Sequence, residues 1–77
     1  MKRREHYKGC HLVAWSHKLK DLGFCSDFCI QEDDADGLME TEYSLPATFP
    51  TRESAIEAGI RAGRQEIDEG FERGSVA

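Results

Sequence analysis

The chain has 77 residues, three cysteines and a formal net charge of −5, values that indicate one small domain. The low, odd number of cysteines disfavours a disulfide-stapled scaffold and favours a reducing compartment, for which the cytoplasm is the default. The basic start of the sequence lacks the apolar run of a signal peptide, and no segment approaches membrane-spanning length.

The first predicted element is a strand over residues 6–15, preceded by a flexible tail at residues 1–5. Period-two alternation divides this strand between two faces. One face would carry Tyr7, Gly9, His11, Val13 and Trp15, and the other Cys10, Leu12 and Ala14. A polar connection follows at residues 16–22.

Two further strands are predicted over residues 23–31 and 38–47, joined by a turn at residues 33–37. The Asp-Gly pair at the end of this turn supplies the positive φ that a tight hairpin needs. Phe24, Phe28 and Ile30 would share one face of the second strand. Glu40, Glu42 and Ser44 would share one face of the third, as expected for an antiparallel sheet with a solvated face.

A long helix is predicted after Thr51, whose hydroxyl can cap the first turn, and Gly70 is its natural stop. Its apolar face would consist of Ile56, Gly59, Ile60, Gly63 and Ile67. The isoleucines should pack against Phe24, Phe28 and Ile30, or against the equivalent face of the sheet. The glycines each cost about 1 kcal/mol relative to Ala within a helix. They therefore indicate either close approach of the helix backbone to the sheet or a groove for a ligand or partner.

The predicted fold class is α+β, with a three-stranded antiparallel meander followed by one long helix packed on one sheet face (β-β-β-α). The single domain would span residues 1–77. Its ordered core would cover about residues 6–71, with flexible tails at residues 1–5 and 72–77.

The cysteines and the acidic residues are the candidate metal ligands. Cys25 and Cys29, with Cys10 and His11, suggest zinc, but strand residues four apart lie roughly 13 Å from each other. That separation is too large for a shared ion with ~2.3 Å bonds. The acidic segment at residues 32–37 resembles the start of a calcium loop, but Tyr43 stands where the closing Glu is required. We therefore expect no metal and no cofactor.

Catalytic motifs are missing from the sequence. His6, His11 and His17 offer groups that titrate near neutral pH. There is, however, no nucleophile elbow, phosphate-binding glycine loop or metalloprotease helix. The sequence predicts no enzyme, no catalytic residue and no small-molecule substrate.

Charge is distributed unevenly along the chain. Residues 1–20 carry six Lys or Arg against one acid, whereas residues 21–45 carry eight acids and no base. Basic residues interleaved with aromatic ones suit phosphate contact and base stacking. The candidate binding surface consists of Lys8, His11, Trp15, Lys18 and Lys20. The acidic middle third disfavours nucleic-acid binding. The separation of basic and acidic segments would instead allow attraction between neighbouring strands or head-to-tail self-association.

Three short motifs carry a family resemblance: Tyr7-Lys8-Gly9 at the opening of a strand, Phe49-Pro50-Thr51 before the helix, and the segment 67–71 that closes it. In these the chain resembles small bacterial domains, including the family of HlyU-type transcriptional activators. The resemblance covers most of the chain, with departures at residues 25–29 and in the acidic hairpin. It implies bacterial origin and transcriptional regulation, and it implies no site residues.

These observations predict a non-enzymatic cytoplasmic module that binds a protein partner or forms a homo-oligomer, without contact to a membrane. The alternative is a regulatory nucleic-acid-binding module that uses the basic first strand.

Overall fold

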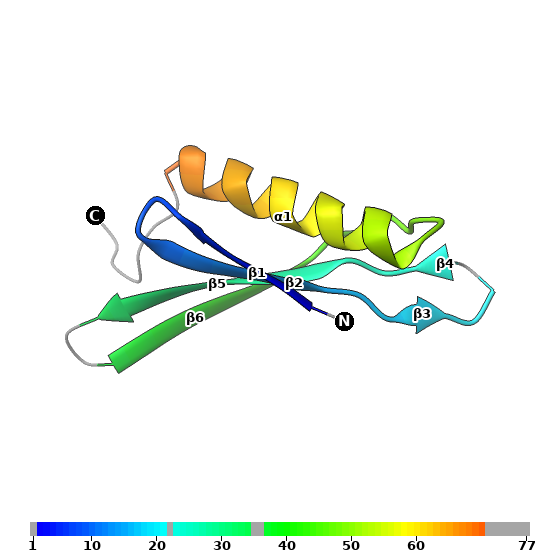
Figure 1. The fold of residues 1–77 in the computed structure, drawn as a ribbon, viewed down its shortest axis with the longest axis horizontal. Coiled ribbons are helices and arrows are strands. Elements are labelled where there is room, and N and C mark those ends of the chain that lie inside the picture. The colour runs from blue at the N-terminus through cyan, green and yellow to red at the C-terminus, as the bar shows by residue number, and fades with distance from the viewer. Residues whose placement is uncertain (1, 22, 35–36, 71–77) are drawn as a thin grey trace.

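The computed structural model describes residues 2–21, 23–34 and 37–70. The chain forms an α+β domain whose elements are β1 (Lys2–Tyr7), β2 (Cys10–Trp15), β3 (Lys18–Leu19), β4 (Gly23–Phe24), β5 (Asp27–Asp34), β6 (Gly37–Ser44) and α1 (Arg52–Asp68). A four-stranded antiparallel sheet has the order β1-β2-β5-β6, and β3 pairs with β4 in a two-stranded ribbon. Helix α1 lies across one face of the sheet (Figure 1). The predicted class and the helix packed on the sheet are thus confirmed.

The single strand predicted over residues 6–15 is wrong, because the chain reverses direction within it. Lys8 and Gly9 have φ values of 48° and 82°, and positive φ at both loop positions is what a two-residue type I′ hairpin requires. Tyr7 consequently faces Cys10 across the hairpin. Residues 2–5, expected to be a flexible tail, belong to the edge strand β1. The sheet of the meander therefore has a fourth strand.

The β3–β4 ribbon continues the β2–β5 pair in an unchanged register. Trp15 faces Asp27. Lys18, three residues after Trp15, faces Phe24, three residues before Asp27. The backbone N–H of Cys25 donates to the His17 carbonyl at 3.1 Å, which bridges the interruption. The strand predicted over residues 23–31 corresponds to β4 and β5 together, with a break between them.

The acidic hairpin is tighter than predicted. β5 runs to Asp34, which faces Gly37 at the start of β6, so most of the predicted turn at residues 33–37 is strand. The two connecting residues, 35–36, lie outside the described residues. β6 ends at Ser44, and after residues 45–48 the chain pairs again when Phe49 forms an isolated bridge with Phe24.

The predicted helix and its cap are confirmed. Thr51 has an extended backbone, and its Oγ1 accepts from the Ser54 N–H at 3.0 Å. Ser54 Oγ accepts from the Thr51 N–H at 3.2 Å, which completes a capping box. At the other end Gly70, with φ 91°, donates its N–H to Ile67 O at 3.2 Å.

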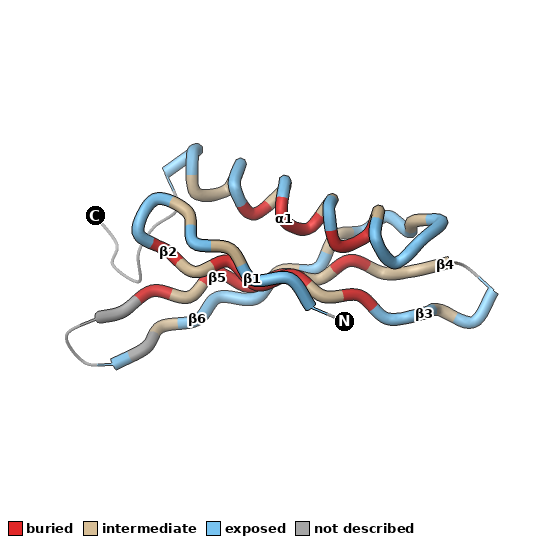
Figure 2. Tube along the Cα trace, in the orientation of Figure 1, coloured by how far each residue is buried: buried red, intermediate tan, exposed pale blue. Residues whose placement is uncertain are grey.

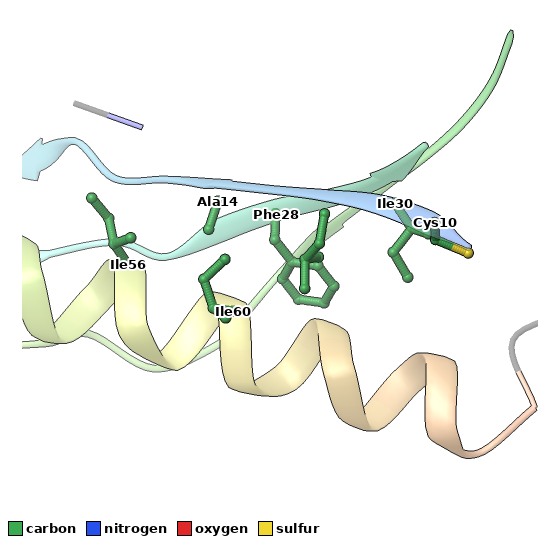
Figure 3. Close-up of a cluster of buried hydrophobic side chains, with 7 residues drawn as sticks. Cys10, Ala14, Phe28, Ile30, Ile56 and Ile60 are labelled. Carbon is green, nitrogen blue, oxygen red and sulfur yellow. The ribbon is translucent and has the colours of Figure 1, made fainter. Parts of the chain in front are cut away.

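The hydrophobic core lies between α1 and the sheet. Figure 2 shows burial concentrated on the helix side facing the sheet and along the central strands. The buried cluster consists of Cys10, Leu12, Ala14, Phe28, Ile30, Ile56 and Ile60, most of them drawn in Figure 3. Ile67 is only partly buried at its margin. Phe24, expected in the core, is half-buried outside this cluster, with the Arg52 guanidinium carbon 5.3 Å from its ring centroid.

The two helix glycines allow α1 to approach the sheet. A Cβ at Gly63 would overlap Leu12 Cδ1 and lie 2.8 Å from its Cδ2. A Cβ at Gly59 would lie 3.1 Å from Ser26 Oγ and 3.2 Å from Ala14 Cβ. Close packing, rather than a ligand groove, therefore accounts for both glycines.

Candidate functional site

The sheet face opposite α1, here called the helix-free face, gathers chemically distinct side chains in ordered rows. Residues that face each other across neighbouring strands project to the same side, and alternate residues project to opposite sides. The register therefore assigns three rows to this face, namely Lys2-Trp15-Asp27-Ser44, Arg4-Val13-Cys29-Glu42 and His6-His11-Gln31-Glu40.

A groove of about 420 Å³ runs over the helix-free face. Its floor contains Val13, Trp15 and Cys29 from the central strands. Val13 is 4% exposed and Cys29 5% exposed, although α1 lies on the opposite face of the sheet. Neighbouring long side chains shield both groups, so the half-buried Trp15 is the floor residue that keeps apolar surface for contact with a partner.

The two walls of the groove carry opposite charges. Lys2 and Arg4 form the wall on β1, and Glu40 and Glu42 form the wall on β6. Gln31 Nε2 donates to Glu40 Oε2 at 2.6 Å, which holds one acidic side chain in place. The chain's uneven charge distribution thus becomes a polarity across the sheet, from one edge strand to the other.

The thiols on the helix-free face are poor nucleophiles. Burial, followed by the nearby carboxylates of Glu40 and Glu42, raises the pKa of Cys29. Burial also raises the pKa of Cys25, and the hydrogen bond to Asp27 adds to the effect. Both groups are therefore thiols at neutral pH, whereas nucleophilic attack requires a thiolate.

The five residues of the predicted binding surface are spread along the molecule. Trp15 lines the groove, and His11 stacks on His6 with ring centroids 4.9 Å apart. Lys8 lies in the β1–β2 hairpin loop, where it contacts Asp68 at 2.6 Å. Lys18 belongs to β3. It follows Lys8 by ten residues, and ten residues of strand span roughly 33 Å. Lys20 follows in the turn beyond β3.

The basic wall of the groove lies in a segment for which the sequence predicts a flexible tail. Lys2 and Arg4 continue the period-two spacing of His6 backwards from the hairpin. The turn at Lys8-Gly9 places them opposite Trp15 and Val13.

Within the described ranges, no helix has the length and apolar character needed to cross a membrane. Comparison of the chain with protein-family models, with curated proteins and with solved structures found no match. The resemblance to HlyU-type activators consequently stays a prediction, and the groove on the helix-free face is the basis for assigning a function.

Proposed function

We propose that the protein is a non-enzymatic protein-binding module that self-associates through its helix-free face. The observation that carries the proposal is the arrangement of a basic wall, an apolar floor and an acidic wall across one exposed sheet face. Such a surface is complementary to a second copy of itself. Closed two-fold dimers use one such patch twice.

Charge selects one of the face-to-face arrangements. A two-fold axis parallel to the strands lays β1 of each copy over β6 of the other, so Arg4 lies near Glu42 of the second copy at two symmetric places. An axis perpendicular to the strands within the interface would instead set basic wall against basic wall. Both axes keep the strands of the two sheets aligned, as sheets that pack face to face require, so the charges decide between the two arrangements.

The expected association is weak and sensitive to salt. Three rows over four strands cover roughly 20 Å by 20 Å, or about 400 Å² per copy, which is below the area of a standard stable interface. Exposed charge pairs are screened within a Debye length of about 10 Å at 0.1 M salt. Trp15 on the floor supplies salt-independent attraction, and the walls supply orientation.

Paired charge reversals test this arrangement. Arg4 and Glu42 are about 14 Å apart within one chain, three strand spacings, so they form no direct pair there. We expect Arg4→Glu or Glu42→Arg alone to abolish the dimer, because each places like charges together at both symmetric contacts between positions 4 and 42 and leaves one wall without net charge. A mixture of the two variants should form a heterodimer, since each wall then meets an opposite charge.

Sedimentation equilibrium at low and high salt, up to about 1 mM protein for a weak interface, provides the measurement. Arg61→Glu, the same charge change on an exposed helix position, is the matched control and should leave the dimer intact. Monomers at every concentration, or failure of the mixed variants to associate, would contradict the proposal.

Nucleic-acid binding is the competing outcome. The acidic wall on β6 shares the helix-free face with Lys2 and Arg4 and opposes approach of a phosphate backbone. We expect no oligonucleotide binding at physiological salt. Sub-micromolar binding at ~150 mM salt, weakened by Arg4→Glu and steeply salt-dependent, would replace self-association with the alternative function.

We infer the cytoplasm as the place of action. Cys10, Cys25 and Cys29 are all free thiols, and reducing compartments preserve thiols in this state.

A further inference from the structure

Three metal-ligating side chains meet where the four-stranded sheet passes into the β3–β4 ribbon. The ligand atoms of His17, Cys25 and Asp27 all lie within 4.8 Å of one another. Cys25 Sγ is 3.2 Å from His17 Nδ1, 3.3 Å from His17 Nε2 and 3.3 Å from Asp27 Oδ2. His17 Nδ1 is 3.9 Å from Asp27 Oδ2.

These separations match one face of a tetrahedral coordination shell. Zinc binds thiolate sulfur at about 2.3 Å and nitrogen or oxygen at about 2.0–2.1 Å, so neighbouring tetrahedral ligands are roughly 3.5 Å apart. The observed sulfur–nitrogen, sulfur–oxygen and nitrogen–oxygen distances scatter around this value. An ion can therefore contact all three groups after small side-chain adjustments.

We propose that His17, Cys25 and Asp27 form a three-ligand site for a divalent transition-metal ion, with zinc as the ion their chemistry fits best. Thiolate and imidazole ligands favour zinc over magnesium or calcium, which prefer oxygen. The fourth position would be open to water, as in zinc sites that exchange ligands. The thiol proton leaves to solvent when the metal binds.

The backbone fixes the relative positions of two of the ligands. The Cys25 N–H donates to the His17 carbonyl, and the neighbouring residues Lys18 and Phe24 pair directly. His17 and Cys25 are thus cross-strand partners on a common face, and Asp27 lies two residues further along the same strand. This convergence arises from strand pairing, whereas the sequence suggests Cys29, Cys10 and His11 as the companions of Cys25.

Side chains around the cluster orient it and leave it accessible. Ser44 Oγ donates to Asp27 Oδ1 at 2.7 Å, which leaves Oδ2 directed at Cys25. Such outer-shell hydrogen bonds hold metal ligands in position. The Asp27 side chain is 16% exposed and that of His17 is 65% exposed. Cys25 Sγ is almost equidistant from both ring nitrogens, so the exposed imidazole must turn to direct one of them at an ion.

Cobalt(II) titration tests the site directly, because the cobalt spectrum reports both tetrahedral geometry and thiolate ligation. Purified, chelator-treated protein kept under reducing conditions is titrated with Co²⁺ and then with Zn²⁺. We expect one equivalent of cobalt per chain, visible bands of a tetrahedral ion and a thiolate-to-cobalt charge-transfer band. Zinc should displace the cobalt stoichiometrically.

Ligand variants show which residues bind the ion. Cys25→Ser should abolish the charge-transfer band, and His17→Gln and Asp27→Asn should each weaken cobalt binding by about tenfold or more, at least the effect seen for outer-shell partners. Cys29→Ser and Cys10→Ser are the matched controls and should keep the full spectrum. Circular dichroism of each metal-free variant establishes that it is folded.

Three results would overturn the proposal. They are no tetrahedral cobalt spectrum at stoichiometric metal, a spectrum that survives in Cys25→Ser, and a spectrum lost in Cys29→Ser. All three ligands belong to one chain and the cobalt spectrum requires no dimer, so this outcome is distinguishable from that of the self-association test.

Discussion

At Gly63 a single missing methyl group sets the distance between α1 and the sheet. Leu12, the residue that a Cβ at this position would meet, is fully buried and cannot turn towards solvent. We expect overpacking in Gly63→Ala to cost about 1–3 kcal/mol. This cost opposes the ~1 kcal/mol that Ala gains over Gly in helix propensity, and we expect the free energy of unfolding to fall. Urea denaturation measures the difference.

A double-mutant cycle separates overpacking from other effects of the same substitution. In a Leu12→Ala background the space next to residue 63 is open, so Gly63→Ala should become neutral or stabilising. Equal costs in both backgrounds would show that Leu12 and Gly63 do not interact energetically, and would contradict the close contact between helix and strand.

At the scale of elements, Ile60 is the test of how α1 is held on the sheet. Its side chain is 3% exposed and belongs to the buried cluster with Phe28 and Ile30. We expect Ile60→Ala to lower the free energy of unfolding by ~2–5 kcal/mol, the cost of a large-to-small core substitution. Arg61→Ala, at an exposed neighbouring position, should change the free energy of unfolding by less than about 0.5 kcal/mol. A loss at Ile60 below ~1 kcal/mol would be inconsistent with helix-on-sheet packing.

Local signals explain which elements the sequence predicts correctly. The helix is predicted with its cap because Thr51 acts within a few residues and the isoleucine spacing is periodic. The hairpin at Lys8-Gly9 is missed because a lysine at positive φ is uncommon and alternation continues through the turn. That one missed turn conceals the whole strand β1.

The candidate sites depend on pairing between distant residues, which a single sequence does not reveal. The groove needs β1 beside β2 before Lys2 and Arg4 can oppose Glu42 across the sheet. Likewise, His17 approaches Cys25 only because the register of the β2–β5 pair continues into the ribbon. Trp15 is correctly grouped with His11 and Val13 because period-two alternation is independent of the partner strand. The grouping of Tyr7 with them is wrong, because the turn at Lys8-Gly9 places it opposite Cys10, on the helix side.

At the scale of the whole molecule, two ionic contacts, here called the clamp, join the second half of α1 to the β1–β2 hairpin. Arg64 Nε and Nη2 donate to Glu5 at 2.6 Å and 2.7 Å, a bidentate pair. Asp68 accepts from Lys8 Nζ at 2.6 Å and from Tyr7 Oη at 2.9 Å. The clamp holds the edge strand under the helix, where the buried core ends.

The clamp predicts an acid-sensitive contribution to stability. The hydrogen bond from Arg64 lowers the pKa of Glu5, and hydrogen bonds from Lys8 and Tyr7 lower the pKa of Asp68. The unfolded chain therefore binds protons at a higher pH than the folded chain. The stability that the clamp contributes is present above the ordinary carboxyl pKa and is lost as pH falls through the lowered pKa values of the folded chain. The free energy of unfolding should fall between about pH 5 and pH 3, the range around ordinary carboxyl pKa values.

Urea denaturation across this pH range checks the prediction. Glu5→Gln and Asp68→Asn should each make the pH dependence shallower, because each removes a carboxylate whose pKa folding lowers. Glu57→Gln, on the exposed side of α1, is the matched control and should keep the original slope. Equal slopes in all four proteins would show that the clamp does not contribute.

The clamp also constrains the order in which a nascent chain can fold. Its contacts join residues 59 to 61 positions apart, whereas the β1–β2 hairpin is complete within residues 2–15. During synthesis on the ribosome the hairpin can therefore form early, while the apolar side chains of Cys10, Leu12 and Ala14 have no helix over them. Exposed strands of this kind associate readily with other incomplete chains. The arrival of α1 ends that period of exposure, and closure of the clamp can only follow it.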